Sequence, residues 1–379
     1  MTHPITYDVA IVGGGLAGLA LSIQLRRKGH SVILMEKETY PFHKVCGEYI
    51  SLESWDFLKD LGVDLDAMQV PIIKQLVISS AGGKLLKHAL PQGGFGISRY
   101  LLDDTLVQIA EAAGVVVLQN TKVNDIIFKE DTFIIDNNLR QYNAKMACAC
   151  YGKRSNMDIK WKRPFSLAPK NKINNYIGVK YHITTSLPAD TIALHHFKNG
   201  YCGIVKIEGD RYNLCYLTRA DNLQQGKGDI RTMERNILSQ NPHLKKILQE
   251  SETSFTAPLT ISQISFDKKS QVENHVLMMG DAAGMITPLC GNGMSMALHA
   301  SKIAAGHIDD FLNDQITRAE LENRYTRQWN KQFARRMYTG RSIQRLFGSR
   351  WLSDFFIAAV KPFPGIINYL VRQTHGRRF

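Results

Sequence analysis

Three glycines near the start of the chain have the spacing that binds a dinucleotide. Gly13, Gly15 and Gly18 form a GxGxxG pattern. The first glycine permits a tight turn, the second lets the backbone approach a pyrophosphate, and the third lets a helix pack closely on a strand. Glu36 follows at the distance at which a carboxylate accepts hydrogen bonds from ribose hydroxyls. The residues of this region expected at the cofactor are Gly13, Gly15, Leu16, Ala17, Gly18, Glu36 and Lys37.

A strand, a helix and a second strand are predicted around these glycines. Asp8–Val12 is an apolar run typical of a buried strand, and Val32–Met35 is a second such run. Leu16–Lys28 between them has a helical pattern and is followed by Gly29 at a C-cap position. This unit places the two strands parallel in one sheet and points the N-terminus of the helix at the phosphate. The unit alone does not distinguish NAD from FAD.

A second glycine-rich group lies far downstream and is suited to a flavin. The apolar run Val276–Met279 predicts a short buried strand before it, and a helix is predicted over Gly293–Ile308 after it. Amides at the N-terminus of that helix can stabilise the negative charge of a reduced flavin, and glycines let the backbone approach the ring. The group comprises Gly280, Asp281, Pro288, Gly291, Asn292, Gly293 and Met294, and the family resemblance described next implies that these residues lie at the cofactor.

Together the two groups resemble the flavoprotein superfamily of p-hydroxybenzoate hydroxylase, whose fold the geranylgeranyl reductases share. The resemblance runs from residue 5 to about residue 305. It implies an FAD-dependent oxidoreductase in which Asp281 binds the ribityl chain and Arg99, at the start of a predicted helix, reaches the FAD. It also implies NAD(P)H as an electron donor. Tyr151, however, replaces the aspartate of the family's DGxxS segment, which leaves direct use of NAD(P)H open.

The segment His43–Glu48 resembles the CGE segment that lies beside the flavin in geranylgeranyl reductases. We therefore expect Cys46 to contact the cofactor. Cys46 is a candidate for redox chemistry or for shaping the substrate pocket, and the alternative is a small buried hydrophobe. Glu48 is a candidate proton donor or substrate anchor, and the alternative is a loop carboxylate that holds backbone amides.

Tyr201 is the candidate substrate contact. It lies on a predicted strand where reductases of this fold carry an aromatic stretch, although a core aromatic residue is an equal alternative. His195 and His196 are adjacent on a neighbouring predicted strand and therefore point to opposite faces, so at most one can face an active site. We see no metal-ligating cluster in the sequence.

The predicted fold class is α/β: a Rossmann-type FAD-binding domain with an inserted antiparallel-sheet substrate domain and a helical C-terminal segment. Strand patterns between Tyr176 and Leu217, with turns at Asn199-Gly200 and Gly209-Asp210, indicate the antiparallel sheet. A hairpin is predicted around Gly82-Gly83. We assign 1–70, 97–160 and 271–310 to the FAD-binding domain, 71–96 and 161–270 to the substrate domain, and 311–379 to the helical, basic segment.

The formal net charge of +13 is concentrated near the end of the sequence. Residues 331–379 hold ten lysines and arginines and one acid, Asp354, and ten minus one leaves nine positive charges. Because the rest of the chain is only mildly basic, we expect no nucleic-acid partner. Apolar residues alternate with these arginines, as in a helix that lies on an anionic membrane or at the mouth of a lipophilic pocket. The alternative is a helix packed on the body with a solvated basic face.

Six cysteines without a CxxC pair, no secretory pattern and no apolar stretch of membrane-spanning length predict a reduced, cytoplasmic protein. Peripheral membrane association through the basic segment is left open. Flavin halogenation is not expected, because the tryptophan-rich halogenase motif is absent and no lysine is suitably placed.

Three functions remain. The first is a flavoprotein monooxygenase that hydroxylates a lipophilic small molecule, aromatic or polyketide-like. The second is a geranylgeranyl-reductase-like enzyme that saturates C=C bonds of a polyprenyl lipid, which the CGE segment favours. The third is a non-catalytic protein that binds a prenyl or lipid group on a flavin fold. Intact Asp281 and both glycine groups disfavour the third.

Overall fold

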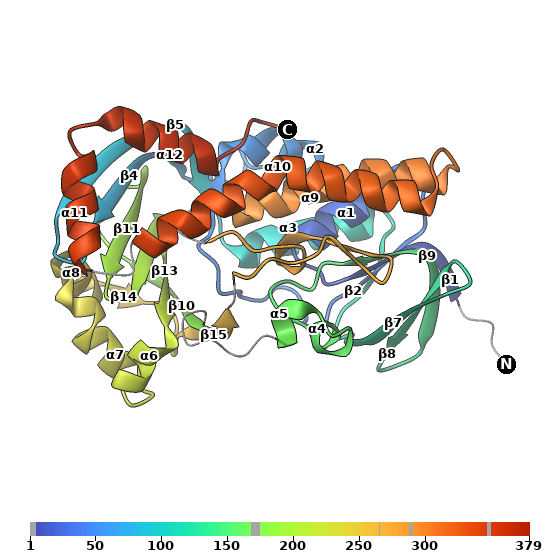
Figure 1. Cartoon of the computed structure of the whole chain (residues 1–379), viewed down its shortest axis with the longest axis horizontal. Helices are drawn as coiled ribbons and strands as arrows, with labels where there is room; N and C mark the ends of the chain where they lie inside the picture. The colour runs from blue at the N-terminus through green and yellow to red at the C-terminus, as the bar shows by residue number, and fades with distance from the viewer. Residues whose placement is uncertain (1–4, 168–174, 265, 288–290, 347–349) are drawn as a thin grey trace.

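The computed structural model describes residues 5–167, 175–264, 266–287, 291–346 and 350–379. It contains two sheets side by side, with long helices across one of them (Figure 1). The eight-stranded first sheet comprises β1 (Ile5–Val12), β2 (Val32–Met35), β6 (Val116–Leu118), β7 (Val123–Lys129), β8 (Thr132–Asn137), β9 (Gln141–Ala149), β16 (Val272–Glu273) and β17 (Val276–Met278).

The centre of the first sheet is parallel, and the carboxyl-terminal halves of β1 and β9 and the whole of β2 are buried. β1 pairs with β2 and with β9 in parallel, and β17 pairs in parallel with β9. β2 consists of four consecutive buried apolar residues, the pattern expected of a strand covered on both faces. The carboxyl ends of these strands therefore meet at one edge of the sheet, where ligands bind in open α/β folds.

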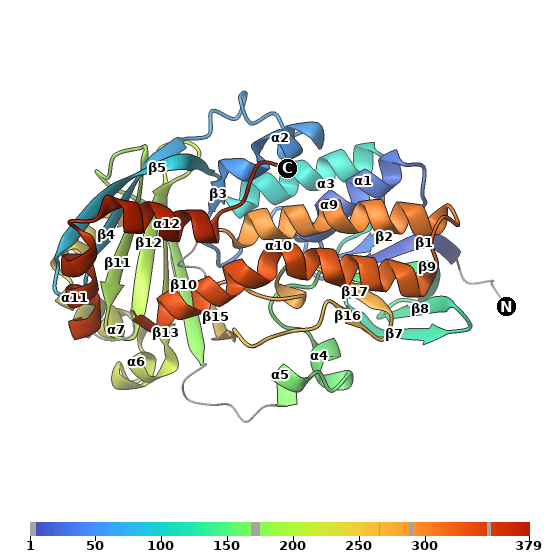
Figure 2. The same ribbon diagram turned by 45° about the horizontal axis from the view of Figure 1, so that its top comes forward.

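Long helices cover the first sheet. The helices of this half and its short connections are α1 (Leu16–Arg27), η1 (Leu52–Ser54), α2 (Trp55–Asp60), α3 (Arg99–Ala112), α4 (Asn156–Lys160), α5 (Pro164–Leu167), η4 (Gly280–Ala282), α9 (Gly293–Leu312) and α10 (Arg318–Leu346). α1 packs between α3 and α9, and α10 packs on α9. Figure 2 shows α9 and α10 running side by side over the sheet.

The nine-stranded second sheet is mostly antiparallel. Its strands are β3 (Tyr49–Ser51), β4 (Ile72–Ser79), β5 (Leu85–Gly96), β10 (Tyr176–Thr184), β11 (Thr191–Phe197), β12 (Gly200–Lys206), β13 (Tyr212–Arg219), β14 (Glu252–Thr253) and β15 (Leu259–Ile264). The predicted hairpin is present as β4 and β5, and β4 joins the later strands by pairing in parallel with β11. Short helices at this end are α6 (Ala220–Gln225), α7 (Ile230–Asn236), η3 (Leu238–Gln240) and α8 (Pro242–Glu250).

Two C-terminal helices, α11 (Arg350–Val360) and α12 (Pro364–Thr374), fold back onto the second sheet (Figure 1). His88 of β5 and Asn368 of α12 hydrogen bond at 2.8 Å between Nε2 and Oδ1. No single helix among the described residues is long and apolar enough to cross a bilayer. The predicted fold class is confirmed: a parallel-centred sheet, a second antiparallel sheet, and a helical C-terminal region.

Candidate functional site

One cavity of about 1250 Å³ joins the two halves of the molecule. It begins at the turn between β1 and α1, passes the loop around Cys46 and the start of α9, and continues along the second sheet to α12. We call the part beside β1, β2 and α9 the cofactor end, and the part between the second sheet and α12 the apolar arm. A cavity of this size exceeds what a typical drug-sized ligand fills.

The first glycine turn forms the cofactor end. Gly13 has a φ of +105°, and a Cβ at this position would lie 2.5 Å from the carbonyl oxygen of Cys150, so the turn requires glycine. Gly15 and the first residues of α1 line the cavity. The N-terminus of α1 therefore faces the cavity, with the partial positive charge that attracts a phosphate.

The carboxylate of Glu36 is fixed at the end of β2. Its Oε2 accepts a hydrogen bond from the backbone N of Gly14 at 2.8 Å, and its Oε1 accepts one from the backbone N of Glu38 at 3.1 Å. Glu36 and Lys37 both line the cavity. The structure thus places a held carboxylate at the predicted ribose position, with its neighbouring lysine on the same wall.

Arg99 stands beside the glycine turn, held by Asp103. The guanidinium Nε and Nη2 each lie 2.7 Å from an oxygen of Asp103, and the Lys44 ammonium lies 2.9 Å from the same carboxylate. Burial acts to raise the pKa of Asp103, but the charges of Arg99 and Lys44 hold that pKa below its usual value. Arg99 lines the cavity near Gly15, where a Cβ would come within 3.8 Å of its Nη2.

The second glycine group closes the cofactor end. Gly280, Asp281 and the segment Gly291–Met294 line the cavity. The Asn292 side chain makes no capping hydrogen bond to the first amides of α9, and Gly293 and Met294 of that first turn line the cavity. Pro288, a further predicted contact, lies outside the described residues.

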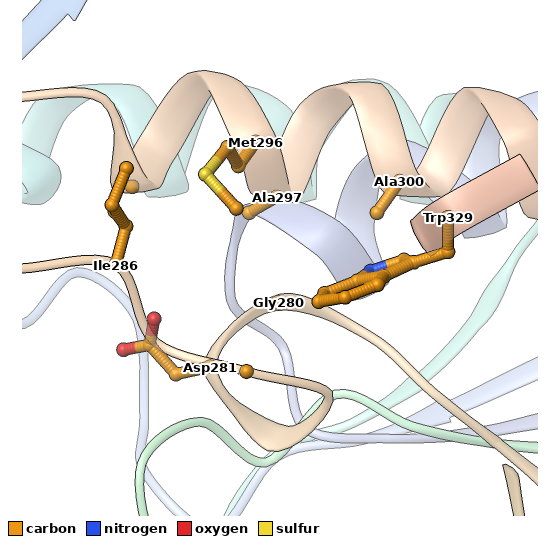
Figure 3. A pocket seen from close by; sticks show the side chains of 9 residues that line it. Gly280, Asp281, Ile286, Met296, Ala297, Ala300 and Trp329 are labelled. Atoms are coloured by element: carbon orange, nitrogen blue, oxygen red, sulfur yellow. The ribbon is translucent and has the colours of Figure 1, made fainter. Parts of the chain in front are cut away.

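A small hollow of about 10 Å³ separates η4 from α9 and α10 (Figure 3). The Asp281 side chain points away from Trp329 of α10 in this view. Nearby, Lys269 donates from Nζ to the backbone oxygens of Asp281 at 2.8 Å and of Lys153 at 3.0 Å. Burial lowers the pKa of Lys269 to about 8. The hollow between η4 and α9 has room for about one water molecule and is too small for a cofactor. We therefore place the ligand in the cofactor end of the large cavity.

Cys46 lies between the two glycine groups. Its side chain is half-buried and lines the cavity, and its Sγ is 3.5 Å from the Sδ of Met294 in the first turn of α9. The structure therefore brings the predicted Cys46 loop against the predicted flavin-facing helix.

Glu48 faces away from the cavity and into a buried ionic cluster. Its carboxylate lies 2.5 Å from Lys180 Nζ and 2.8 Å from His182 Nε2, and it accepts a hydrogen bond from the Arg99 backbone N at 2.8 Å. Burial acts to raise the pKa of Glu48, but the His182 hydrogen bond and the Lys180 charge outweigh it and lower that pKa. Of the two sequence alternatives, this is the geometry of a carboxylate that holds the loop.

Lys180 and His182 were not singled out by the sequence analysis. They stand at alternate positions of β10, so both side chains project from the same face of the strand. The available signal was two polar side chains at alternate positions of a strand whose other residues are mostly apolar. Their partner Glu48 was recognised, but the pairing joins residues far apart in the sequence.

The apolar arm is walled by aliphatic side chains from both sides. The sheet contributes Leu76, Ile78, Leu86, Leu90, Ile192, Leu194 and Val205, and the C-terminal helices contribute Val360, Ile367, Leu370 and Val371. Tyr201 is buried and also lines the cavity, packed in a cluster with Leu217, Ile264, Phe266 and Met285. Among the described residues, the second sheet, α11 and α12 contribute no lysine to the cavity wall.

The adjacent histidines of β11 point to opposite faces, as predicted. His196 lines the cavity, and burial lowers its pKa to about 3. His195 instead hydrogen bonds through Nδ1 with the hydroxyl of Ser79 at 2.8 Å. In the described ranges, no group of three or more His, Cys, Asp or Glu side chains is arranged to hold a metal ion.

Tyr151, in place of the family's aspartate, is held by a different acid. Its hydroxyl donates to Asp158 Oδ1 at 2.7 Å, and Arg163 Nη1 lies 2.9 Å from the same oxygen. Asp158 is thus fully engaged within the protein, and Tyr151 forms part of the cavity wall.

Comparison with known proteins identifies a family and several relatives. The profile of a family described as an FAD binding domain matches residues 6–338. Conditioned medium factor receptor 1 of Dictyostelium discoideum is 24% identical over 377 residues, covering 86% of this chain and 68% of that protein. Kynurenine 3-monooxygenase of Christiangramia forsetii is 22% identical over 357 residues, covering 86% and 75%. Reductases as well as monooxygenases occur among the relatives.

Among solved structures, the flavin-dependent brominase Bmp2 is similar to this chain with a TM-score of 0.79. The identity is 20%, and the match covers 97% of this chain and 93% of that one. This likeness shows a shared fold.

Proposed function

Since the chain belongs to the FAD-binding domain family, we propose that it is a monooxygenase that hydroxylates a lipophilic small molecule, aromatic or polyketide-like. Membership confirms the predictions of FAD as cofactor and of an FAD-dependent oxidoreductase. The observation that supports the finer proposal is the single cavity that runs from both glycine groups into an apolar arm. An enzyme that brings a lipophilic ring to a flavin needs such a connection.

The residues at the cofactor end fit FAD. Gly13 could not carry a side chain, and Glu36 presents a fixed carboxylate where a ribose hydroxyl would donate. Arg99 supplies positive charge beside the open start of α1, next to the place for the pyrophosphate. Asp281 would hold the ribityl chain, and the first amides of α9 would stabilise negative charge on the ring. When bound, FAD supplies the redox chemistry that activates O₂.

The residues of the apolar arm would position the substrate and exclude water. Its aliphatic walls favour an apolar ligand and disfavour water near the reacting atoms. Tyr201 and His196, both on the wall, are the polar side chains that could orient a substrate hydroxyl. Cys46, where the arm meets the cofactor end, would set the distance between substrate and flavin.

The second candidate is a reductase that saturates C=C bonds of a polyprenyl lipid, and the CGE-like segment favours it. Such a reaction needs a proton donor as well as a hydride. Glu48 is held as an anion by Lys180 and His182 and lies off the cavity wall, so it is poorly placed to donate a proton. This observation leads us to prefer hydroxylation.

A product assay distinguishes the candidates. The FAD-loaded protein is incubated with reductant and a panel of lipophilic phenols and polyprenyl lipids, under ¹⁸O₂ and under nitrogen. Hydroxylation gives a product that contains one ¹⁸O atom and requires oxygen. A saturated lipid formed under nitrogen would overturn the proposal in favour of the reductase. Yellow protein that converts neither class while binding the lipids would favour the non-catalytic alternative.

A NAD(P)H titration identifies the electron donor. Bleaching of the flavin absorbance by NADPH or NADH under nitrogen supports direct use of a nicotinamide. If dithionite bleaches the flavin and neither nucleotide does, a separate reductase must supply the electrons.

A further inference from the structure

The two C-terminal helices present apolar residues on both of their sides. One side closes the cavity with Val360, Ile367, Leu370 and Val371. This side is anchored to the second sheet, because Asp354 Oδ1 accepts a hydrogen bond from the backbone N of Gly82 at 3.2 Å. A helix on a protein surface ordinarily buries one apolar stripe and turns polar residues outward. These helices depart from that pattern.

The opposite side is exposed, and we call it the outer face. Its apolar members are Phe355, Ala358, Ala359, Pro362, Phe363, Ile366 and Tyr369. Phe363 is 59% exposed, Ile366 45% and Tyr369 57%. The last two are three residues apart on α12, so their side chains project from the same stripe of that helix. Large apolar residues concentrated in this way mark an interaction site.

Positive charges border the outer face. Lys361 lies in the turn between α11 and α12, Arg372 in the last turn of α12, and Arg377 just beyond it, and all three are exposed. The single acid of residues 350–379, Asp354, is hydrogen bonded to the second sheet. The outer face therefore combines aromatic and aliphatic side chains with an excess of positive charge at its border, which is the composition of a surface that lies in the headgroup region of an anionic bilayer.

We propose that the outer face docks on the surface of a bilayer rich in anionic phospholipid. The chain between Ser353 and Gln373 is apolar enough to span a membrane by length and composition, but it bends by 117° at its break. A bent pair of helices anchored on a sheet can lie in the interface. Figure 1 places the turn between α11 and α12 at an end of the molecule away from the first sheet, where a flat surface can reach it.

A bilayer suits this face better than a soluble acidic protein does. Protein interfaces contain about one hydrogen bond per 100–200 Å². The outer face offers cations at its edge and few other donors or acceptors, whereas a bilayer accepts apolar side chains in its interior and cations at its phosphates. The same helices wall the apolar arm, so docking would bring the arm next to the phase in which a lipophilic substrate collects; this last point rests on the proposed function.

Vesicle flotation tests the proposal on the full FAD-loaded protein. We expect the protein to float with vesicles of phosphatidylcholine and phosphatidylglycerol, to float less with phosphatidylcholine alone, and to be released by salt because the charges become screened. Equal flotation with both vesicle types, or none with either, would overturn the proposal.

Two variants and matched controls locate the contact. Phe363→Ser with Ile366→Ser should weaken partition into the anionic vesicles by about tenfold for each side chain. The control is Leu139→Ser with Ile159→Ser, which removes residues that are 70% and 55% exposed on the other half of the molecule. The control should partition like the wild type. Equal losses in both double variants would contradict docking through the outer face.

The charges are tested in the same assay. Lys361→Gln and Arg372→Gln should each weaken partition by about fivefold, while Lys129→Gln, at another exposed site, should not. Flavin absorbance shows that each variant is folded. An acidic carrier protein that binds through the outer face, with no vesicle binding, would overturn the proposal. Because flotation requires no turnover, a protein that floats but does not hydroxylate contradicts the proposed function and leaves this inference standing.

Discussion

The cofactor end of the cavity is built largely from main chain, whereas the apolar arm is built from side chains. At the cofactor end the glycine turns and the starts of α1 and α9 bring the backbone to the cavity, and charged groups such as Glu36 and Arg99 are fixed by hydrogen bonds. In the arm, aliphatic residues from β4, β5, β11, β12, α11 and α12 make the wall. Main-chain geometry tolerates little change, and an aliphatic wall can be remodelled. On the proposed function, the fold would fix the position of the cofactor, and the side chains of the arm would select the substrate.

The largest effect is expected at the first glycine. Gly13→Ala places a Cβ against the Cys150 carbonyl at a φ of +105°. We expect FAD affinity to fall by about a thousandfold, about 4 kcal/mol, so that the protein purifies colourless. Gly29→Ala is the matched control, because Gly29 has a φ of +94° but no atom within 4 Å of the added Cβ. A Gly13→Ala protein that purifies yellow, with FAD bound, would contradict a cofactor end that depends on main-chain geometry.

The next effect is expected at Glu48, the buried carboxylate that holds the Cys46 loop from behind the cavity wall. Glu48→Gln leaves Lys180 and His182 without their counter-charge, and we expect the free energy of unfolding to fall by about 3 kcal/mol. Urea denaturation measures the loss. Asp66→Asn, which breaks the exposed 2.7 Å pair with Lys59, should cost less than about 1 kcal/mol. Equal losses of unfolding free energy in Glu48→Gln and Asp66→Asn would show that the ionic cluster of Glu48, Lys180 and His182 does not hold the loop.

The same carboxylate gives a pH dependence. Its folded-state pKa is lowered, so its stabilisation is present above the unfolded pKa and is lost as the pH falls through the folded value. Wild-type stability should therefore decline below about pH 4.3, and the difference between wild type and Glu48→Gln should shrink there. Urea denaturation curves of wild type and Glu48→Gln, measured from neutral pH to below about pH 4.3, show whether the stability difference shrinks. A difference that grows on acidification contradicts an ionised Glu48.

A smaller effect, confined to one end, is expected in the arm. Leu194→Trp narrows the arm, and we expect catalytic efficiency on the lipophilic substrate to fall about thirtyfold, about 2 kcal/mol, with unchanged flavin absorbance. Leu139→Trp, at a site that is 70% exposed, is the control. Loss of flavin in the Leu194 variant would show that the two ends are not independent.

The smallest effect is expected where the ends meet. If Cys46 acts by packing against Met294, Cys46→Ser should change kcat by less than about threefold, or about 0.7 kcal/mol. A Leu298→Ala variant, in the buried part of α9, reports general disturbance of that helix. A loss of several hundredfold in Cys46→Ser alone would assign direct chemistry to the thiol.

The cofactor end could be predicted from sequence because its determinants are local. Gly13, Gly18 and Glu36 lie within one strand–helix–strand unit, and the Gly291–Met294 turn sits directly before its helix. The arm could not be predicted, because its wall assembles from six separate helices and strands, and any one of them looks like an ordinary core element. Lys180 and His182 were not predicted as site residues for the same reason, since only the fold shows that they contact Glu48. β3 was also missed, because three residues are too short for a period-two pattern.

β17 pairs with β9, and β11 pairs with β4. These pairings limit when each sheet can be completed during synthesis of the chain. Both sheets take strands from widely separated stretches, so neither is complete while the first half of the chain is being made. Gly13 and Gly293 are 280 positions apart, which at about 10 residues per second corresponds to about half a minute of translation. During that interval the first glycine turn has been synthesised, but α9, which lines the same cavity, has not. We therefore expect flavin binding to follow the synthesis of α9, late in the production of the chain.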